Sequence, residues 1–493
     1  MRFSVKQTGS VGEFMMNGKK IAVTGAAVAL ALTGAVLLFC TGRNSKKTGG
    51  DFSTLSWSEA FTKLNETMAN EYAFTQWKNI QWQEMYSEYL PQIESAQSKN
   101  SFDDYYTAIH AYLNRIPDGH VRMNSISDID DKYIGGGFGF AVAKLDDGRI
   151  IVSWTEPEGP AFEAGLRAGD ALIEWNGQPI ADAVDAVSVL YSGTSATEEY
   201  LHQKQLAYLV RSPVGTGVSL TAVSKESGRT YSAALTAYDD GKLSLKKNYP
   251  NSVVSDKLRD MFLGYENPDP EPKAIVEKKI IGNNICYIRL LAELDADLQQ
   301  TGKSVSTLGL MSEAVSFAID NQCPAIILDI RNNIGGLDSM AADILGLFYS
   351  QKTLYEYQKF FGSDQLGKVF IQPARQRYSG KVIALINSRC VSSGEGLAMG
   401  IRNLPNGETL GFFGTNGSFG LAGSEIKMPD GITVEFPSGQ SLDEGMNIQI
   451  DSRDGIGGIS PSIRTPMTEE NAIKAANGED VELEEALRIS ATY

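Results

Sequence analysis

Residues 381–396 hold the residue types best suited to nucleophilic chemistry in this chain. The apolar, β-branched run 381–387 predicts a buried strand, and the sequence turns helical from about Gly394. Ser392 lies at the joint, where the free N–H groups and the dipole of a helix N-terminus favour developing negative charge. A serine nucleophile beside an oxyanion site needs this placement. The spacing Ser392-x-x-Glu395 also predicts a capping box, in which the serine only satisfies backbone N–H groups.

A second segment with chemical potential follows the most apolar strand, at residues 325–330. It reads Asp329-Ile330-Arg331-Asn332-Asn333-Ile334-Gly335-Gly336. Ligand sites in α/β folds lie beyond the carboxyl ends of such strands. Gly335 and Gly336 let backbone N–H groups approach a substrate oxygen closely, as oxyanion donors must. The alternative is a glycine turn with an internal Asp329–Arg331 pair.

A histidine base has three candidates in the whole chain, His110, His120 and His202. His120 ends the string Asp118-Gly119-His120, at the close of a segment with helical spacing. His110 is predicted to pack within a helix, and His202 falls inside a β-rich module. A histidine at a helix end is often structural, so the residue type alone leaves the role of His120 open.

The composition excludes several classes of function. The chain has 493 residues, which is enough for about three domains, and a formal net charge of −16 that would repel an anionic partner such as nucleic acid. Four cysteines show no metal-ligand spacing. Cys286, Cys323 and Cys390 lie in apolar, strand-like contexts and are predicted to be buried thiols. We expect no metal site and no cofactor.

The first 50 residues are predicted to contain a cytoplasmic or signal segment, a membrane anchor and a linker. The uncharged apolar run 21–41 is long enough to span a bilayer or to serve as a signal sequence. Leu37-Leu38-Phe39-Cys40 loosely resembles a lipoprotein box, although Phe39 is bulky where a small residue is expected. We expect a membrane-tethered protein outside the cytoplasm, and the anchor chemistry stays open.

Three further regions follow along the chain. Residues 51–125 have aromatic and aliphatic side chains at helical spacing and predict a small helical bundle. Residues 133–237 alternate short strands with glycine turns. Residues 250–490 alternate strands with helices and predict an α/β layer structure, with an appended hairpin at 425–437.

The β-rich segment resembles a PDZ domain. The resemblance rests on Gly137-Phe138-Gly139-Phe140, on Gly159-Pro160-Ala161 and most specifically on the run 164–177, AGLRAGDALIEWNG. PDZ domains bind a peptide C-terminus as an added strand, with its carboxylate held by a glycine loop. The resemblance implies that Gly137, Phe138, Gly139 and Phe140 form this loop. The alternative is glycines that only make β-turns.

Segments 325–336, 382–396 and 410–420 together resemble the C-terminal processing and tricorn family of serine peptidases. The resemblance implies a crotonase-like α/β core with an inserted PDZ domain and an N-terminal helical bundle. It also implies that Ser392 is the nucleophile, and that the N–H groups of Ser393 and of Gly335 or Gly336 are the oxyanion donors.

The family resemblance implies two possible bases. One branch places a lysine in a Thr-x-Gly-Lys string, but this chain has Thr415-Asn416-Gly417-Ser418 there. The tricorn-like branch uses a histidine before the PDZ insertion, which His120 matches. The acid of that branch precedes a Gly-Val/Ile-x-Pro string, here starting at Gly458, so Asp451 and Asp454 both qualify. Asp451 is favoured slightly because it ends an apolar strand.

These residues together predict a serine endopeptidase that processes peptides or proteins with a free C-terminus, by a Ser-His-acid mechanism and with help from the PDZ domain. The alternative is an inactive scaffold of the same fold that binds peptides or apolar ligands. Neither the substrate nor the oligomeric state follows from the sequence.

Overall fold

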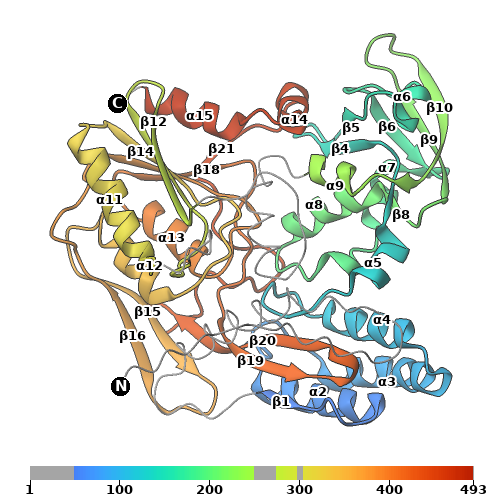
Figure 1. Ribbon diagram of the computed structural model, residues 1–493, viewed down its shortest axis with the longest axis horizontal. Helices are drawn as coiled ribbons and strands as arrows, with labels where there is room; N and C mark the ends of the chain where they lie inside the picture. Colours follow the sequence, from blue (N-terminus) through green and yellow to red (C-terminus); the bar gives the residue numbers. More distant parts are fainter. Residues whose placement is uncertain (1–48, 249–273, 297–303, 492–493) are drawn as a thin grey trace, which may run out of the picture.

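The computed structural model describes residues 49–248, 274–296 and 304–491. The apolar run 21–41 lies outside the described residues. Within these ranges, no helix is both long enough and apolar enough to cross a membrane. A helical region, a β-rich module and an α/β core lie around a common centre (Figure 1).

The central sheet of the α/β core has the strand order β12-β13-β14-β17-β18-β21. Neighbouring strands are parallel except for β12 and β13. The strands are β12 (Val276–Ile281), β13 (Ile285–Leu290), β14 (Ala325–Asp329), β17 (Lys381–Leu385), β18 (Gly407–Gly411) and β21 (Ile463–Arg464). The predicted strands at 325–330 and 381–387 are therefore confirmed as β14 and β17.

Helices cover both faces of this sheet, and side chains alternate between the two layers. Ile326 and Leu328 pack in a core shared with α11, α12 and α13, whereas Ala325 and Ile327 pack in a second core shared with α15. The helices are α11 (Thr307–Asp320), α12 (Asp338–Leu345), α13 (Ser393–Arg402) and α15 (Val481–Ser490). The carboxyl ends of β14 and β17 lie side by side, because Asp329 pairs with Leu385. The two segments with predicted chemistry therefore leave the sheet at the same edge.

The N-terminal helices share their core with a second sheet. They are α2 (Trp57–Glu71), α3 (Trp82–Lys99) and α4 (Phe102–Leu113). This sheet runs β1-β19-β20-β15-β16, with β2 also on β20. Its strands are β1 (Gly49–Asp51), β2 (Arg122–Met123), β15 (Thr353–Phe360), β16 (Leu366–Ile371), β19 (Leu421–Lys427) and β20 (Thr433–Leu442). The predicted hairpin is confirmed as β19 and β20, and its Ile426, Val434 and Phe436 are buried among the helices.

The β-rich module has a five-strand sheet path, β10-β9-β6-β5-β4, and a small sheet β11-β3-β8. The strands of the first sheet are β4 (Phe140–Lys144), β5 (Ile150–Thr155), β6 (Ala171–Trp175), β9 (Gly217–Val223) and β10 (Thr230–Thr236), with β7 (Gln178–Pro179) on β6. The second has β3 (Gly136–Gly137), β8 (Arg211–Ser212) and β11 (Tyr238–Asp239). The module's helices are α5 (Ser127–Ile134), α6 (Pro160–Glu163), α7 (Ile180–Asp185), α8 (Glu198–Leu209) and α9 (Leu243–Asn248), and the later α14 (Glu469–Ala476) packs on β5.

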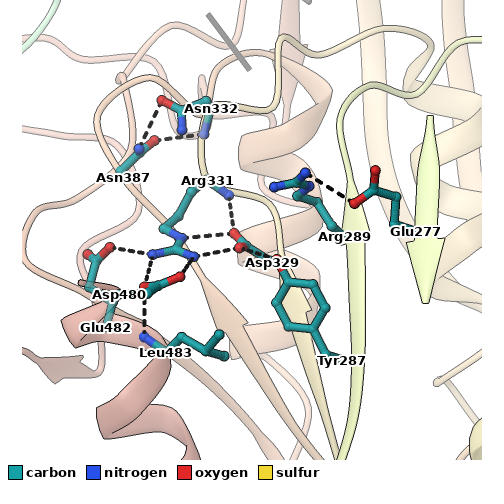
Figure 2. Close-up of polar contacts among 10 residues, drawn as sticks. All are labelled: Glu277, Tyr287, Arg289, Asp329, Arg331, Asn332, Asn387, Asp480, Glu482 and Leu483. Carbon is teal, nitrogen blue, oxygen red and sulfur yellow. Dashed lines mark hydrogen bonds and ion pairs between the residues drawn. The ribbon is translucent and has the colours of Figure 1, made fainter. Parts of the chain in front are cut away.

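A buried ion network lies directly beneath the loop that follows β14 (Figure 2). The Arg331 guanidinium donates to both carboxylate oxygens of Asp329 at 2.9 and 2.6 Å. The same guanidinium donates to Asp480 at 2.7 Å and to Glu482 at 2.9 Å, at the start of α15. Tyr287 donates its hydroxyl to Asp329 at 2.8 Å. The Asp329–Arg331 pair of the alternative interpretation exists, and Arg331 also joins the loop to the C-terminal helix.

Replacing Arg331 by Met should destabilise the protein strongly. The change leaves the buried carboxylates of Asp329 and Glu482 without their cation, which typically costs about 3–5 kcal/mol. Chemical denaturation measures the free energy of unfolding. Arg289→Met is the matched control, because Arg289 pairs with a partly exposed Glu277 at 3.1 Å and should cost only about 0–1 kcal/mol. Equal losses in the two variants would contradict this ranking.

Candidate active site

The turn between β17 and α13 holds Ser392 in an unusual backbone conformation. Its φ of 60° and ψ of −133° are rare for a serine, and such strain is kept where the surroundings enforce it, often at functional sites. Its backbone N–H donates to the Ser418 carbonyl at 3.1 Å and to the Glu395 carboxylate at 3.2 Å. Ser392 is only partly buried, whereas the neighbouring Ser393 is fully buried. The predicted nucleophile therefore stands on a fixed turn at a helix N-terminus.

Glu395 fixes this turn from inside the protein. Its carboxylate is fully buried and accepts hydrogen bonds from the N–H groups of Gly417 at 2.7 Å and Ser418 at 3.0 Å, besides that of Ser392. Burial raises the pKa of Glu395 to about 8, although these N–H donors oppose the rise. Glu395 thus joins the nucleophile turn to the loop 415–419.

Two backbone N–H groups beside Ser392 are free to bind an oxyanion. A Cβ atom added to Gly335 would lie 2.6 Å from the Ser392 Cβ and 3.2 Å from its Oγ, so the glycine loop touches the serine. The Gly335 N–H itself donates to the Asn333 side chain at 2.8 Å. Within the described residues, the N–H groups of Ser393 and Gly336 have no acceptor. Of the two glycines predicted as donors, Gly336 is the one with a free N–H.

An amide pair holds the glycine loop against the loop after β17 (Figure 2). The Asn332 N–H donates to the Asn387 side-chain oxygen at 2.9 Å, and the Asn387 amide donates back to the Asn332 side chain at 3.1 Å. Asn332 itself has a φ of 58°, a conformation that asparagine tolerates better than most residues. The pair therefore joins the glycine loop to the segment that leads into the serine turn.

His120 reaches the core on a short turn after α4. The Asp118 carboxylate is fully buried, accepts the His120 N–H at 2.9 Å and accepts the Tyr72 hydroxyl at 2.7 Å. The His120 Nδ1 lies 3.8 Å from the Asp118 carboxylate and has no hydrogen-bond partner in the described part of the chain. Burial lowers the pKa of His120 to about 4, against the opposing effect of Asp118. The imidazole is therefore neutral at neutral pH, as a general base must be.

Ser418 brings the histidine turn and the serine turn together. Its side-chain Oγ accepts the Gly119 N–H at 2.7 Å, and its carbonyl accepts the Ser392 N–H at 3.1 Å. A Cβ atom on Gly119 would lie 2.4 Å from the Asn416 side chain and 3.0 Å from the Ser418 Oγ, so the two loops approach each other closely. The resemblance leads one to expect a lysine at position 418. The chain instead has Ser418, whose buried hydroxyl accepts a hydrogen bond from the histidine turn.

The two aspartates between which the sequence did not decide, Asp451 and Asp454, differ in burial. Asp451 is buried, and its carboxylate accepts the Phe419 N–H at 3.0 Å and lies 2.7 Å from the Lys78 ammonium. Burial raises the pKa of Asp451 to about 7, while Lys78 opposes the rise. The side chain of Asp454 is 80% exposed beside Arg453. Asp451 therefore joins the 415–419 loop, and Asp454 stays at the surface.

Sequence reasoning missed two members of this buried network, Lys78 and the Asp118 carboxylate. Lys78 lies in the turn between α2 and α3 and donates to the Pro117 carbonyl at 2.7 Å, directly before Asp118. No motif surrounds Lys78, so no sequence signal marked it.

The two other histidines lie away from this site. His110 is buried in the helical core, with its ring 4.6 Å from that of Tyr106, as its helical spacing predicted. His202 lies on α8, where its Nδ1 is 3.8 Å from Asp185.

The predicted glycine loop of the β-rich module is largely engaged in the module's own structure. Phe138 and Phe140 are fully buried in its core. Gly137 pairs with Tyr238 and Arg211 in the small sheet, and Gly139 adopts a φ of 79° and accepts the Glu156 N–H at 2.8 Å.

The segment after the module covers its edge strand. Strand β4 ends the sheet path, and α9 packs against both β4 and α8 (Figure 1). The Val142 N–H on this strand donates to the Asn248 side chain at 3.1 Å. A Cβ atom on Gly137 would lie 2.3 Å from the Asp240 carboxylate. Residues 240–248 therefore lie along the edge and the glycine loop where an added peptide strand is expected.

Comparison with known proteins agrees with this geometry. A sequence model described as Peptidase family S41 matches residues 284–465, which include β14, β17, Ser392 and Asp451. Residues 284–465, which form most of the α/β core, therefore match peptidase family S41. Models of a PDZ domain and of the tricorn protease C1 domain match residues 128–194 and 53–105.

The solved structures similar to this S41 peptidase support the fold. Mature CPAF in complex with lactacystin is 14% identical with a TM-score of 0.61, and the alignment covers 89% of this chain and 98% of that chain. Mature CPAF alone is 13% identical with a TM-score of 0.61, over 89% and 97% of the two chains. At this identity the similarity shows a shared fold across nearly all of the S41 chain.

Gly336→Ala should impair catalysis far more than folding. A Cβ atom there would lie 2.4 Å from the Glu293 carbonyl, so the loop must shift and carry its free N–H away from Ser392. Loss of one oxyanion donor typically lowers kcat by about 10²–10³. Peptidase kinetics and thermal unfolding of the same samples measure both effects. Gly217→Ala is the control, since a Cβ there meets nothing within 4 Å. Unchanged kcat in Gly336→Ala would remove this N–H from the site.

Proposed function

We propose that this S41 chain is a serine endopeptidase in which Ser392 is the nucleophile and His120 the general base. The observation that carries the proposal is that Ser418 accepts two hydrogen bonds. Its side-chain Oγ accepts the Gly119 N–H, and its carbonyl accepts the Ser392 N–H. Two segments more than 270 positions apart in sequence meet on one residue, which is hard to explain without a shared role.

The proposed reaction begins with a neutral His120 that takes the proton from the Ser392 hydroxyl as its oxygen attacks the scissile carbonyl. The N–H groups of Ser393 and Gly336 stabilise the oxyanion of the tetrahedral intermediate. The imidazolium then gives its proton to the leaving amine, and an acyl-enzyme remains on Ser392. Water, deprotonated by His120, releases the acyl group and restores the serine.

Carboxylates support the imidazolium in this scheme. Asp118 is the acid beside His120, and its negative charge favours the protonated ring that forms during attack. Asp451, the acid favoured from the sequence, acts through Lys78 and through the Phe419 N–H on the shared loop. The exposed Asp454 has no part in the proposed mechanism.

The substrate in this proposal is a peptide or protein with a free C-terminus, which adds to the edge of the PDZ domain. The apolar run 21–41 would tether the peptidase to a membrane with its catalytic core outside the cytoplasm, in line with the expectation from the sequence.

Ser392→Ala should abolish peptide hydrolysis and leave the fold intact, because the change removes only the attacking oxygen. A fluorophosphonate probe should label the wild-type protein and not the variant, with the modified residue identified by mass spectrometry. Ser363→Ala is the control, since Ser363 lies in the loop between β15 and β16 and its hydroxyl bonds to Gln365 of the same loop. Absence of labelling in the folded wild type over a range of pH would favour the peptide-binding scaffold.

Asn248→Ala should increase the affinity of the PDZ domain for a C-terminal peptide. The change frees the Val142 N–H on β4, and one hydrogen bond is worth about 1 kcal/mol, or about fivefold in Kd. Fluorescence anisotropy with a labelled peptide in the Ser392→Ala background measures the Kd. Lys246→Ala, on the same helix, is the matched control. A Kd unchanged by Asn248→Ala would show that α9 does not compete with the peptide.

A further inference from the structure

Lys78 places a positive charge where water cannot stabilise it. The side chains of Lys78, Asp118 and Asp451 each have an exposed fraction of 0%. Burying an ammonium costs several kcal/mol, and a buried ion pair repays that cost only with good geometry and further hydrogen bonds. An apolar side chain would often serve stability as well, so the charge needs a reason other than stability.

We propose that Lys78 is a positioning residue for His120, whose buried ammonium joins the Asp118-Gly119-His120 turn to Asp451 and so holds the imidazole at the Ser418 loop. The inference rests on the proposed function, because it gives Lys78 a role in the reaction of His120.

The contacts of the Lys78 ammonium lie on both sides of the site. On the histidine side it donates to the Pro117 carbonyl at 2.7 Å and lies 4.0 Å from the Asp118 carboxylate. On the other side it lies 2.7 Å from the Asp451 carboxylate, which also accepts the Phe419 N–H. Phe419 directly follows Ser418, the residue that receives Gly119. The ammonium thus joins the start of the His120 turn to Asp451, which in turn contacts the loop that bonds to Gly119.

Lys78 does not act as the base in place of a lysine at 418. Burial by itself lowers the pKa of Lys78, but Asp451 and Asp118 outweigh burial and raise it above its ordinary value. The ammonium therefore stays protonated throughout the working range of a peptidase. A permanent cation can hold two carboxylates in place, but it cannot take a proton from Ser392.

Charges on several elements act on His120. Burial is the largest influence on its pKa and lowers it. Asp118 and Glu435 raise the pKa, whereas Lys78 and Arg122 lower it. Lys78 itself faces Asp451, Asp118 and Glu395. Removal of Lys78 takes away one repelling charge and loosens the buried turn, and both changes raise the pKa of His120.

The test compares wild type, Lys78→Met and Lys78→Gln. The second-order rate of fluorophosphonate labelling at Ser392 is measured against pH, with the unfolded fraction of each sample determined in parallel. Both variants should label about ten- to a hundredfold more slowly, because the base is misplaced. The acid limb of the pH–rate profile should move to higher pH, by about one pH unit. Lys78→Gln keeps a donor for the Pro117 carbonyl, so it provides a folded variant if the Met variant unfolds.

Lys381→Met is the matched control. Its ammonium is also largely buried, with a side-chain exposure of 11%, and pairs with Glu408 at 3.2 Å at the opposite end of β17 from Ser392. Lys381→Met should lower the free energy of unfolding and leave the acid limb of the pH–rate profile unchanged. A second readout is the NMR titration of the imidazoles in the Ser392→Ala background, which is tractable because the chain has three histidines. Only the His120 signal should shift in the Lys78 variants.

The outcomes separate the two proposals. An acid limb and a His120 titration that match the wild type in both Lys78 variants would overturn the positioning role. The positioning role would also be overturned if the Lys78 variants lost no more labelling rate than Lys381→Met, after each rate is corrected for the unfolded fraction. A folded wild type without any labelling would refute the peptidase mechanism, while the imidazole titration would still decide whether Lys78 controls His120.

Discussion

The contacts of the loop 415–419 hold the proposed catalytic residues together. Its backbone and the Ser418 side chain bond to the nucleophile turn, to the histidine turn, to Glu395 and to Asp451. The serine turn and the histidine turn belong to segments that pack in two different hydrophobic cores. Because a backbone N–H or C=O buried without a partner is costly, each bond resists any shift of one region relative to the others. The loop therefore fixes the histidine turn relative to the serine turn.

Charge burial is the second constraint on the site. Lys78, Asp118, Asp451 and Glu395 all lie inside the protein, and burial raises the pKa values of Asp451 and Glu395. The network of Arg331 under the glycine loop is built in the same way, with a cation between carboxylates of two distant segments (Figure 2). In both networks, ion pairs join segments that lie far apart in the sequence. The ionic contacts thus add geometric precision to a fold made by apolar packing.

The PDZ domain and the peptidase core of this S41 chain are coupled through segments that belong to neither sheet. Helix α14 from the C-terminal region packs on β5, and α9 covers the edge of β4. A peptide that adds to this edge must therefore disturb a helix of the same chain.

The sequence by itself determined the α/β class, the hairpin, the β14 and β17 strands and the position of Ser392 at a helix N-terminus. These features depend on local periodicity and on glycine and serine at fixed positions, which are readable within a window of about fifteen residues. The family resemblance added His120 and Asp451 as the residues to watch. Only the tertiary structure showed that Asp451 is buried and Asp454 exposed, identified Gly336 as the glycine with a free N–H, and revealed Lys78. Those choices depend on burial and on contacts between residues hundreds of positions apart, and no local pattern in a single sequence encodes such contacts.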